Sequence, residues 1–185
     1  MIAILTHNTE IFLKILKECP EVTYVGEEVL RRLCVEVSLQ EGLEIAEKLK
    51  SVLLKYREIT GLGRGLAAPQ IGFNKRVFVT FMNDEFQFFI NPKLVRASKD
   101  MNFLRESCIS SVLLWADVKR PKDITLSWID EKGESRQEDF TDFPARLLQH
   151  EYDHLEGLVN LDVCEKASIE FVKSSPRDEK LREIQ

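Results

Sequence analysis

Two histidines four residues apart, with a glutamate directly after the first, form the most informative pattern in the sequence. His150, Glu151 and His154 fit the pattern H-E-x-x-H. In a helix, side chains four residues apart share a face, so both imidazoles can bind one metal ion while the glutamate lies beside its open coordination position. The pattern predicts a catalytic metal site in which Glu151 takes a proton from water. The alternative is a buried helix whose histidines only form hydrogen bonds.

Two histidines do not complete a catalytic metal site, so a third ligand is required. The remaining histidine, His7, is distant in sequence, and a carboxylate after the helix, Glu165 or Glu170, is another candidate. Cys108 is a better one, because it lies in the short polar stretch 105–110 and a thiolate beside two imidazoles suits a borderline-soft divalent ion. The spacing alone supports a ligand and a plain buried thiol equally at this position.

Hydrophobic periodicity indicates the helices that must position these residues. The H-E-x-x-H pattern falls in a predicted helix that is apolar over most of its circumference, with Asp142 as its cap and Gly157 at its end. A second, amphipathic helix is predicted between Ser38 and Gly61, because Ser38 and Glu41 have capping-box spacing and apolar residues then recur every three or four positions.

Two β-hairpins are predicted from apolar or alternating segments separated by turn residues. The paired segments are 76–81 with 86–90 around the turn 83–84, and 124–128 with 136–140 around the turn 132–133. Hairpins that do not alternate with helices favour an α+β fold. We therefore expect antiparallel β-hairpins packed around a central buried helix that carries the H-E-x-x-H motif.

Composition limits the class of protein. The 185 residues have no internal linker and predict a single domain, 1–185, and 26 basic against 31 acidic residues give a net charge of −5. This charge argues against nucleic acid as a partner, and no apolar run approaches the roughly 20 residues that span a membrane. Without a targeting signal, we expect a cytoplasmic location. Cys19, Cys34 and Cys164 are expected to be free thiols rather than part of a disulfide framework.

Three ordered motifs resemble those of the peptide deformylase family. Residues 63–70 read GRGLAAPQ, residues 106–110 read ESCIS and residues 149–154 read QHEYDH. The resemblance covers a core of about 24–163, leaving an N-terminal extension, 1–20, and a C-terminal tail, 165–185, expected to be helical. It implies a hydrolase that removes the formyl group from N-formylmethionyl nascent chains and releases formate.

The resemblance also implies the ligands and the catalytic groups. Cys108, His150 and His154 would hold one divalent ion, Fe²⁺ in the first place, with Ni²⁺, Co²⁺ or Zn²⁺ as substitutes. Glu151 would act as general base and then as general acid. Gln70 and the backbone N–H of Ile109 would stabilise the negative charge that develops on the formyl oxygen.

For the substrate, the resemblance implies a formylated peptide that adds as a strand against the segment from Gly63 to Gly65, whose missing side chains permit close approach. Leu104, Phe143 and Leu147 are candidates for the methionine pocket, Leu147 because it lies one turn before the first histidine. Plain core packing is the alternative for these three residues.

The sequence departs from the family pattern in places. Arg64 replaces a residue that is usually aliphatic and faces the methionine pocket, Ser107 replaces a glycine, and segment 111–117 lacks the usual Pro-Gly. These changes predict an altered substrate preference rather than a loss of metal binding. A basic C-terminal helix contacts the ribosome in some family members, but five basic and five acidic residues in 165–185 give little support for such a contact here.

Two other functions compete with deformylation. One is an H-E-x-x-H metallopeptidase that cleaves internal peptide bonds. The other is a degenerate homologue that keeps the fold as a binding module. Retention of every metal-ligand and catalytic side chain that the family pattern requires argues against the second alternative.

Overall fold

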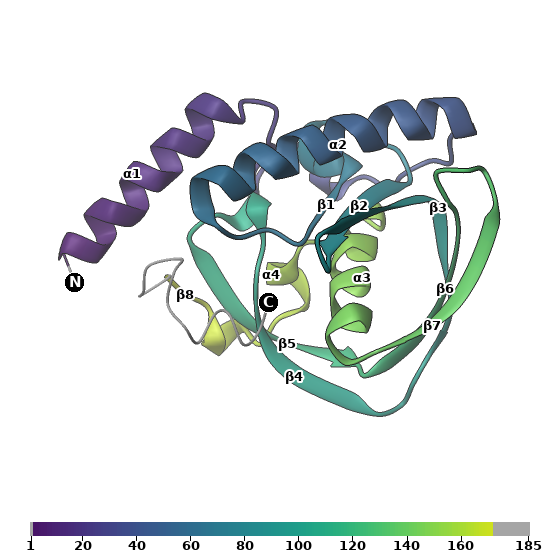
Figure 1. Ribbon diagram of the computed structural model, residues 1–185. Helices are drawn as coiled ribbons and strands as arrows, with labels where there is room; N and C mark the ends of the chain where they lie inside the picture. Colours follow the sequence, from purple (N-terminus) through teal and green to yellow (C-terminus); the bar gives the residue numbers. More distant parts are fainter. Residues whose placement is uncertain (1, 172–185) are drawn as a thin grey trace.

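The computed structural model describes residues 2–171 of the chain, and side chains from residue 8 onward. Its helices are α1 (Ile2–Glu18), α2 (Leu39–Thr60), α3 (Asp142–Leu155) and α4 (Asn160–Val163) (Figure 1). Its strands are β1 (Gly65–Ala67), β2 (Val77–Met82), β3 (Glu85–Ala97), β4 (Met101–Ser107), β5 (Leu114–Pro121), β6 (Asp123–Ile129), β7 (Ser135–Thr141) and β8 (Glu170–Phe171). Short 3-10 turns are η1 (Glu28–Arg31), η2 (Ala68–Ile71), η3 (Ile109–Ser111) and η4 (Lys166–Ser168).

The strands form two antiparallel sheets. One has five strands in the order β1-β2-β3-β6-β7, and the other has three in the order β4-β5-β8. The predicted hairpins are confirmed as β2–β3 and β6–β7, and their turns contain positive-φ residues at Asn83, Asp84 and Gly133. The β4–β5 hairpin was not predicted, although it carries the polar stretch before Cys108. The fold is α+β, as expected.

Alternation along β2 and β3 divides the core into two layers. Val77, Val79 and Ile90 belong to the apolar cluster that also contains the buried face of α2. Phe78 and Phe89 point to the other side, where they stack on each other and join the cluster that contains the apolar side of α3. Successive side chains of a strand face opposite ways, so one sheet supports both helices. Figure 1 shows α2 across one side of this sheet and α3 on the other.

Helix α2 begins and ends where the sequence predicts. The Ser38 hydroxyl accepts a hydrogen bond from the backbone N–H of Glu41 at 3.2 Å, which satisfies one of the free donors at the helix start. Gly61 follows the last turn with φ of +73°, and its N–H donates to the carbonyl of Arg57. This helix therefore ends just before the glycine-containing segment 63–65.

Helix α3 carries the H-E-x-x-H motif and contacts strands of both sheets. The expected cap by Asp142 is wrong: this residue has φ of +54°, its backbone N–H donates to the carbonyl of Lys122, and no side chain caps the helix. The end is as expected, since Gly157 has φ of +77° and the N–H of Leu158 reaches the carbonyl of Asp153 at 2.9 Å.

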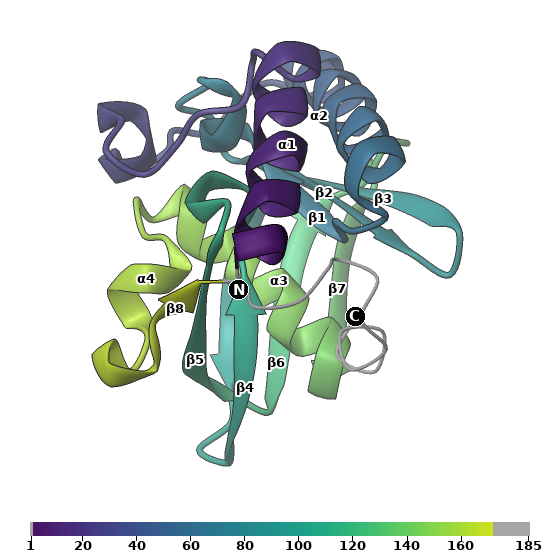
Figure 2. The ribbon, with the colours of Figure 1, turned by 90° about the vertical axis from the view of Figure 1, so that its left-hand side faces the viewer.

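The N-terminal and C-terminal segments pack against this core. Helix α1 packs beside α2 (Figure 2), where Ile15 and the following Cys19 are buried. In the described part of the C-terminal tail, η4 and a strand paired with β5 replace the expected helix, so that prediction is wrong for 165–171. Residues 172–185 and the side chain of His7 lie outside the described residues. Among the described helices, none combines the length and the apolar character needed to cross a membrane.

Candidate active site

The structure brings together the three residues expected to bind a metal ion. Cys108 Sγ lies 3.3 Å from His154 Nε2, and the ligand atoms of Cys108, His150 and His154 all lie within 4.8 Å of one another. Helix α3 supplies the two imidazoles, and the segment between β4 and η3 supplies the thiol. No other group of three metal-ligating side chains occurs among those that the structure describes. Glu170 instead pairs with Arg105.

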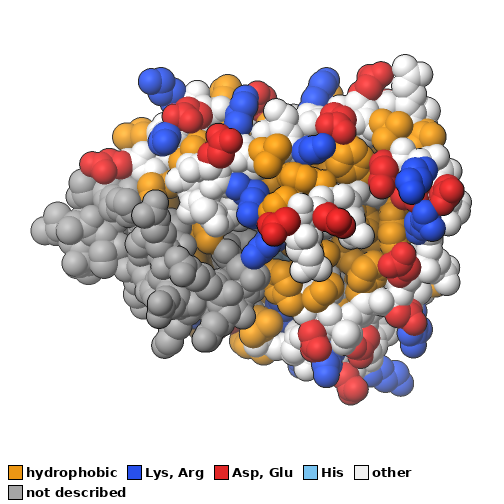
Figure 3. Space-filling view, in the orientation of Figure 1, with side chains coloured by type: hydrophobic (Ala, Val, Ile, Leu, Met, Phe, Trp, Pro, Cys, Tyr) orange, Lys and Arg blue, Asp and Glu red, His pale blue; other side chains and the backbone are white. Residues whose placement is uncertain are grey.

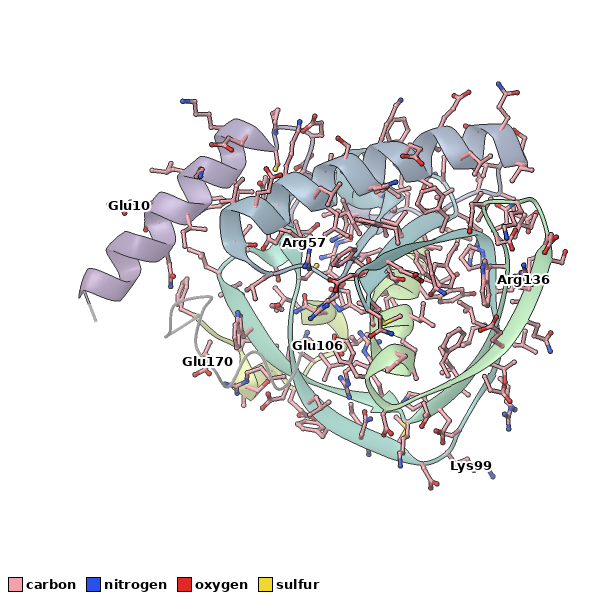
Figure 4. The ribbon with its side chains drawn as sticks, in the orientation of Figure 1. Glu10, Arg57, Lys99, Glu106, Arg136 and Glu170 are labelled. Atoms are coloured by element: carbon pink, nitrogen blue, oxygen red, sulfur yellow. The ribbon has the colours of Figure 1, made fainter. Side chains whose placement is uncertain are left out.

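Glu106 orients one of the imidazoles from the adjoining strand. Its Oε2 lies 2.9 Å from His150 Nδ1, which leaves the other ring nitrogen for the metal. The guanidinium groups of Arg120 and Arg146 also donate to this carboxylate, at 2.6 and 2.5 Å. Burial opposes the charge, but the hydrogen bond from His150 and the charge of Arg120 outweigh it and hold the pKa of Glu106 well below its usual range. Figure 4 shows Glu106 inside the molecule, beside α3.

The two imidazoles lower the pKa of the Cys108 thiol. Burial raises the pKa of Cys108, yet the charge and hydrogen bonds of His154 and His150 outweigh it and hold that pKa well below the ordinary value of a thiol. A thiolate beside two imidazoles is the donor set that a divalent ion requires, because metal binding needs deprotonated ligands. The residues present therefore fit a metal ion.

Glu151 occupies a space that only glycine leaves open. A Cβ atom at Gly65 would lie 2.3 Å from Glu151 Oε1, so β1 can pass the carboxylate only without a side chain there. Glu151 is 3% exposed, its Oε2 has no hydrogen-bond partner among the described residues, and burial raises its pKa to about 7. Such a carboxylate is suited to exchanging protons near neutral pH.

Gln70 and Ile109 both adjoin Cys108, the first in space and the second in sequence. The Gln70 side-chain oxygen accepts from the backbone N–H of Ala67 at 2.8 Å, which fixes the amide and turns its NH₂ group toward Ser110 Oγ, 3.2 Å away, and Cys108 Sγ, 3.5 Å away. Ile109 opens the turn η3 directly after Cys108. Backbone N–H groups at the start of such a turn have no partner within it, so they remain available to an anionic oxygen.

A cavity of about 120 Å³ opens beside these groups. The predicted site residues on its wall are Gly63, Gly65, Gln70, Cys108, Ile109, Phe143, Leu147, His150 and Glu151. Leu104 is not among the lining residues; Arg146, which reaches Asn102 on the same strand, lines the cavity instead. The half-buried Arg64 also lies on the wall. On the face in Figure 3, basic and acidic side chains are mixed rather than gathered by sign.

Sequence reasoning missed several residues of this site. Tyr56 and Trp115 line the cavity, but in the sequence they look like ordinary core positions. The signal that could have revealed Arg120 and Arg146 is their position, since an arginine inside a strand or helix of largely apolar neighbours needs a buried acid. Glu106 is that acid.

An α+β fold in which a buried helix and an adjoining segment bring two imidazoles and a thiol together, with a buried carboxylate next to them, defines a metal-dependent hydrolase. The profile of the Polypeptide deformylase family matches residues 19–169. The chain is 39% identical over 166 residues to the peptide deformylase of Pseudothermotoga lettingae, covering 85% of this chain and 94% of that protein. It is 35% identical to that of Treponema pallidum over 144 residues, 77% of this chain and 86% of the relative. This chain belongs to the peptide deformylase family.

Solved structures agree in fold. A peptide deformylase of Synechococcus elongatus in complex with actinonin aligns with a TM-score of 0.67 at 31% identity, over 88% of this chain and 82% of that one. A peptide deformylase of Acinetobacter baumannii with Met-Ala-Ser bound aligns with a TM-score of 0.69 at 27% identity, over 77% of this chain and 96% of that one.

Proposed function

We propose that the chain is a single-domain enzyme that hydrolyses the formyl amide of N-formylmethionyl nascent chains. The products are formate and a free amino terminus, and the reaction takes place in the cytoplasm. Membership of the peptide deformylase family supports the reaction. The observation that carries the proposal is the buried Glu151 carboxylate, whose Oε2 has no hydrogen-bond partner among the described residues, in the cavity that Cys108 and His150 also line. A carboxylate beside a metal site is what the hydrolysis of an unactivated amide needs.

Cys108, His150 and His154 would hold the metal ion. The thiolate-containing donor set and the family resemblance favour Fe²⁺, with Ni²⁺, Co²⁺ and Zn²⁺ as substitutes. When bound, such an ion acts as a Lewis acid that makes a water molecule acidic near neutral pH. Glu106 holds the ring of His150 in the orientation that this binding requires.

The residues around the cavity would transfer the protons and stabilise the developing negative charge. Glu151 takes a proton from the attacking water and then delivers it to the nitrogen of the leaving amine, so the proton count balances as the C–N bond breaks. Gln70 Nε2 and the N–H of Ile109 donate to the formyl oxygen as its negative charge develops. Removing one donor of this kind lowers the rate by about 10²- to 10³-fold in other hydrolases.

The peptide would bind along β1. This strand is at the edge of the five-stranded sheet, so the backbone groups on its outer side can pair with an extended substrate. The methionine side chain would then lie against Phe143 and Leu147, which α3 presents to the same cavity. Arg64 lies on this wall, where its charge would alter the preference for the substrate side chains.

Replacing Gly65 with alanine tests the placement of Glu151. The added Cβ displaces the carboxylate, and we expect kcat/KM for formyl-Met-Ala-Ser to fall by about 10²-fold, as catalytic groups lose activity steeply when misplaced. The matched control is Gly42→Ala, whose Cβ would lie 2.7 Å from the Ile90 side chain in the core. The control should lower the unfolding temperature and leave kcat/KM unchanged. Full activity of the Gly65 variant would contradict the placement.

The reaction itself is tested by product analysis. Formate should appear from formyl-Met-Ala-Ser in step with a new primary amine, and casein should stay intact. Cleavage of casein without release of formate would instead identify a metallopeptidase. A metal-loaded protein that produces neither result would be a binding module.

A further inference from the structure

A second cavity of about 40 Å³ lies next to the catalytic cavity. Four residues line both: Tyr56, Leu62, Ser107 and Trp115. The two spaces are therefore separated only by side chains that already face the substrate site. The far wall of the second cavity comes from α1, through Asn8, Ile11, Phe12 and Ile15.

Helix α1 is not part of the family core. The family profile begins at residue 19, so the whole of α1 precedes the match. The helix is nevertheless fixed to the core, because Ile15 is 3% exposed and the ring of Phe12 meets that of Tyr24 edge-on at 5.7 Å. The extension thus adds a wall to the second cavity, and it lies alongside α2 (Figure 2).

The walls of the second cavity suit an aliphatic group. Most lining side chains are aliphatic or aromatic. The Thr60 hydroxyl on the wall is already engaged, since it donates to the carbonyl of Tyr56 at 2.8 Å. With a volume of about 40 Å³, this cavity is about a third the size of the catalytic cavity. We therefore expect it to accept a small aliphatic side chain such as that of leucine more readily than the ring of phenylalanine.

We propose that this cavity binds the aliphatic side chain of the third residue of the formylated chain. The inference rests on the proposed function. In an extended peptide, residues one and three point to the same side. With the methionine in the first cavity, the third side chain is the one that faces the adjoining space, and the second points away. Helix α1 makes this enzyme selective for the sequence that follows the initiator methionine.

The experiment compares formate release from two peptide series, formyl-Met-Ala-X and formyl-Met-X-Ala, with X as alanine, leucine or phenylalanine. In the first series we expect kcat/KM to be about tenfold higher for leucine than for alanine. Phenylalanine should give no such gain, and the second series should show no leucine preference. Equal rates for alanine and leucine in the first series, or a preference confined to the second, would overturn the proposal.

Two variants of α1 connect the preference to the cavity. Ile11→Phe fills the space, so the ratio of kcat/KM for leucine to that for alanine in the first series should fall to about one. Phe12→Ala enlarges the space and should move the preference toward phenylalanine. Leu13→Phe changes a residue of the same helix that is 59% exposed and does not line the cavity, so this matched control should behave as the wild type.

The outcomes separate the two proposals. If the wild type releases no formate from any peptide, the proposed function fails and the subsite fails with it. If it turns over every peptide well but without preference, only the subsite fails. A leucine preference that survives in both folded cavity variants would show that another part of the protein binds this side chain.

Discussion

Replacing Glu151 with glutamine is expected to lower kcat for formate release by about 10²- to 10⁴-fold. The amide has nearly the same shape as the carboxylate, but it cannot take a proton from water. Metal content should stay at the wild-type level, because the residues expected to bind the ion are Cys108, His150 and His154. Burial already disfavours charge at this position, so the neutral amide should also fold at least as well as the carboxylate. Formate release and metal analysis on the same preparation measure both effects.

The control for this substitution is Glu138→Gln, which makes the same chemical change on the exposed side of β7. It should leave both kcat and metal content unchanged. Activity of Glu151→Gln within twofold of the wild type would place the general base elsewhere. Loss of the metal together with activity would instead make Glu151 a ligand or a support of the ligands.

Local patterns predicted the elements that local interactions determine. The Ser38 cap, the Gly61 end and the apolar stripe between them define α2 within one stretch of sequence, and the structure follows them. The hairpins were predictable for the same reason, because turn residues and alternation lie next to each other along the chain. Asp142 shows the limit of such reasoning. Its side chain has the right chemistry for a cap, but the hydrogen bond from its backbone N–H to the carbonyl of Lys122, between β5 and β6, decides its conformation.

Local sequence patterns predicted only part of the candidate site. His150, Glu151 and His154 share one helical turn, so spacing alone places them together. Cys108 comes from the segment that follows β4, and the residues alone left its role open until the ordered motifs were considered together. The approach of Gly65 to Glu151 depends on how β1 crosses α3, which no periodicity encodes.

Residues whose role depends on long-range packing could not be assigned from sequence. Tyr56 belongs to the apolar stripe of α2 and still lines the catalytic cavity, because it lies where that helix passes the glycine segment. Leu104 was expected at the methionine pocket, but the guanidinium of Arg146 reaches across to its strand and lines the cavity. The residues of α1 that line the second cavity could not be assigned from sequence either, because their role depends on where this helix packs against the core.

Glu106 is the junction of these long-range contacts. It connects β4 to β5 through Arg120 and to α3 through Arg146 and His150. One carboxylate thus joins the three elements that must stay in register for the thiol of Cys108 to meet the imidazoles. Because both arginines have about 5% or less of their side chains exposed, water cannot replace this carboxylate if it is lost.

Replacing Glu106 with alanine is therefore expected to lower the free energy of unfolding by about 3–5 kcal/mol, since it leaves the buried Arg146 without its counter-charge and Arg120 with Asp153 alone. Metal affinity should fall by about 10- to 100-fold, because His150 loses the group that orients its ring. Chemical denaturation and metal titration measure the two effects. The matched control is Glu134→Ala, which breaks an exposed ion pair with Arg136 and should cost less than about 1 kcal/mol.

A second substitution separates lost counter-charge from lost packing. Arg146 Nε has no hydrogen-bond partner within the described structure, and burial lowers the pKa of this guanidinium, so its charge is held in place mainly by Glu106. Adding Arg146→Leu to Glu106→Ala removes one stranded cation and should recover part of the lost stability. The metal affinity should not recover, because His150 still lacks its partner. If the double variant is less stable than Glu106→Ala, or if it regains wild-type metal affinity, the carboxylate does not act through these two separate contacts.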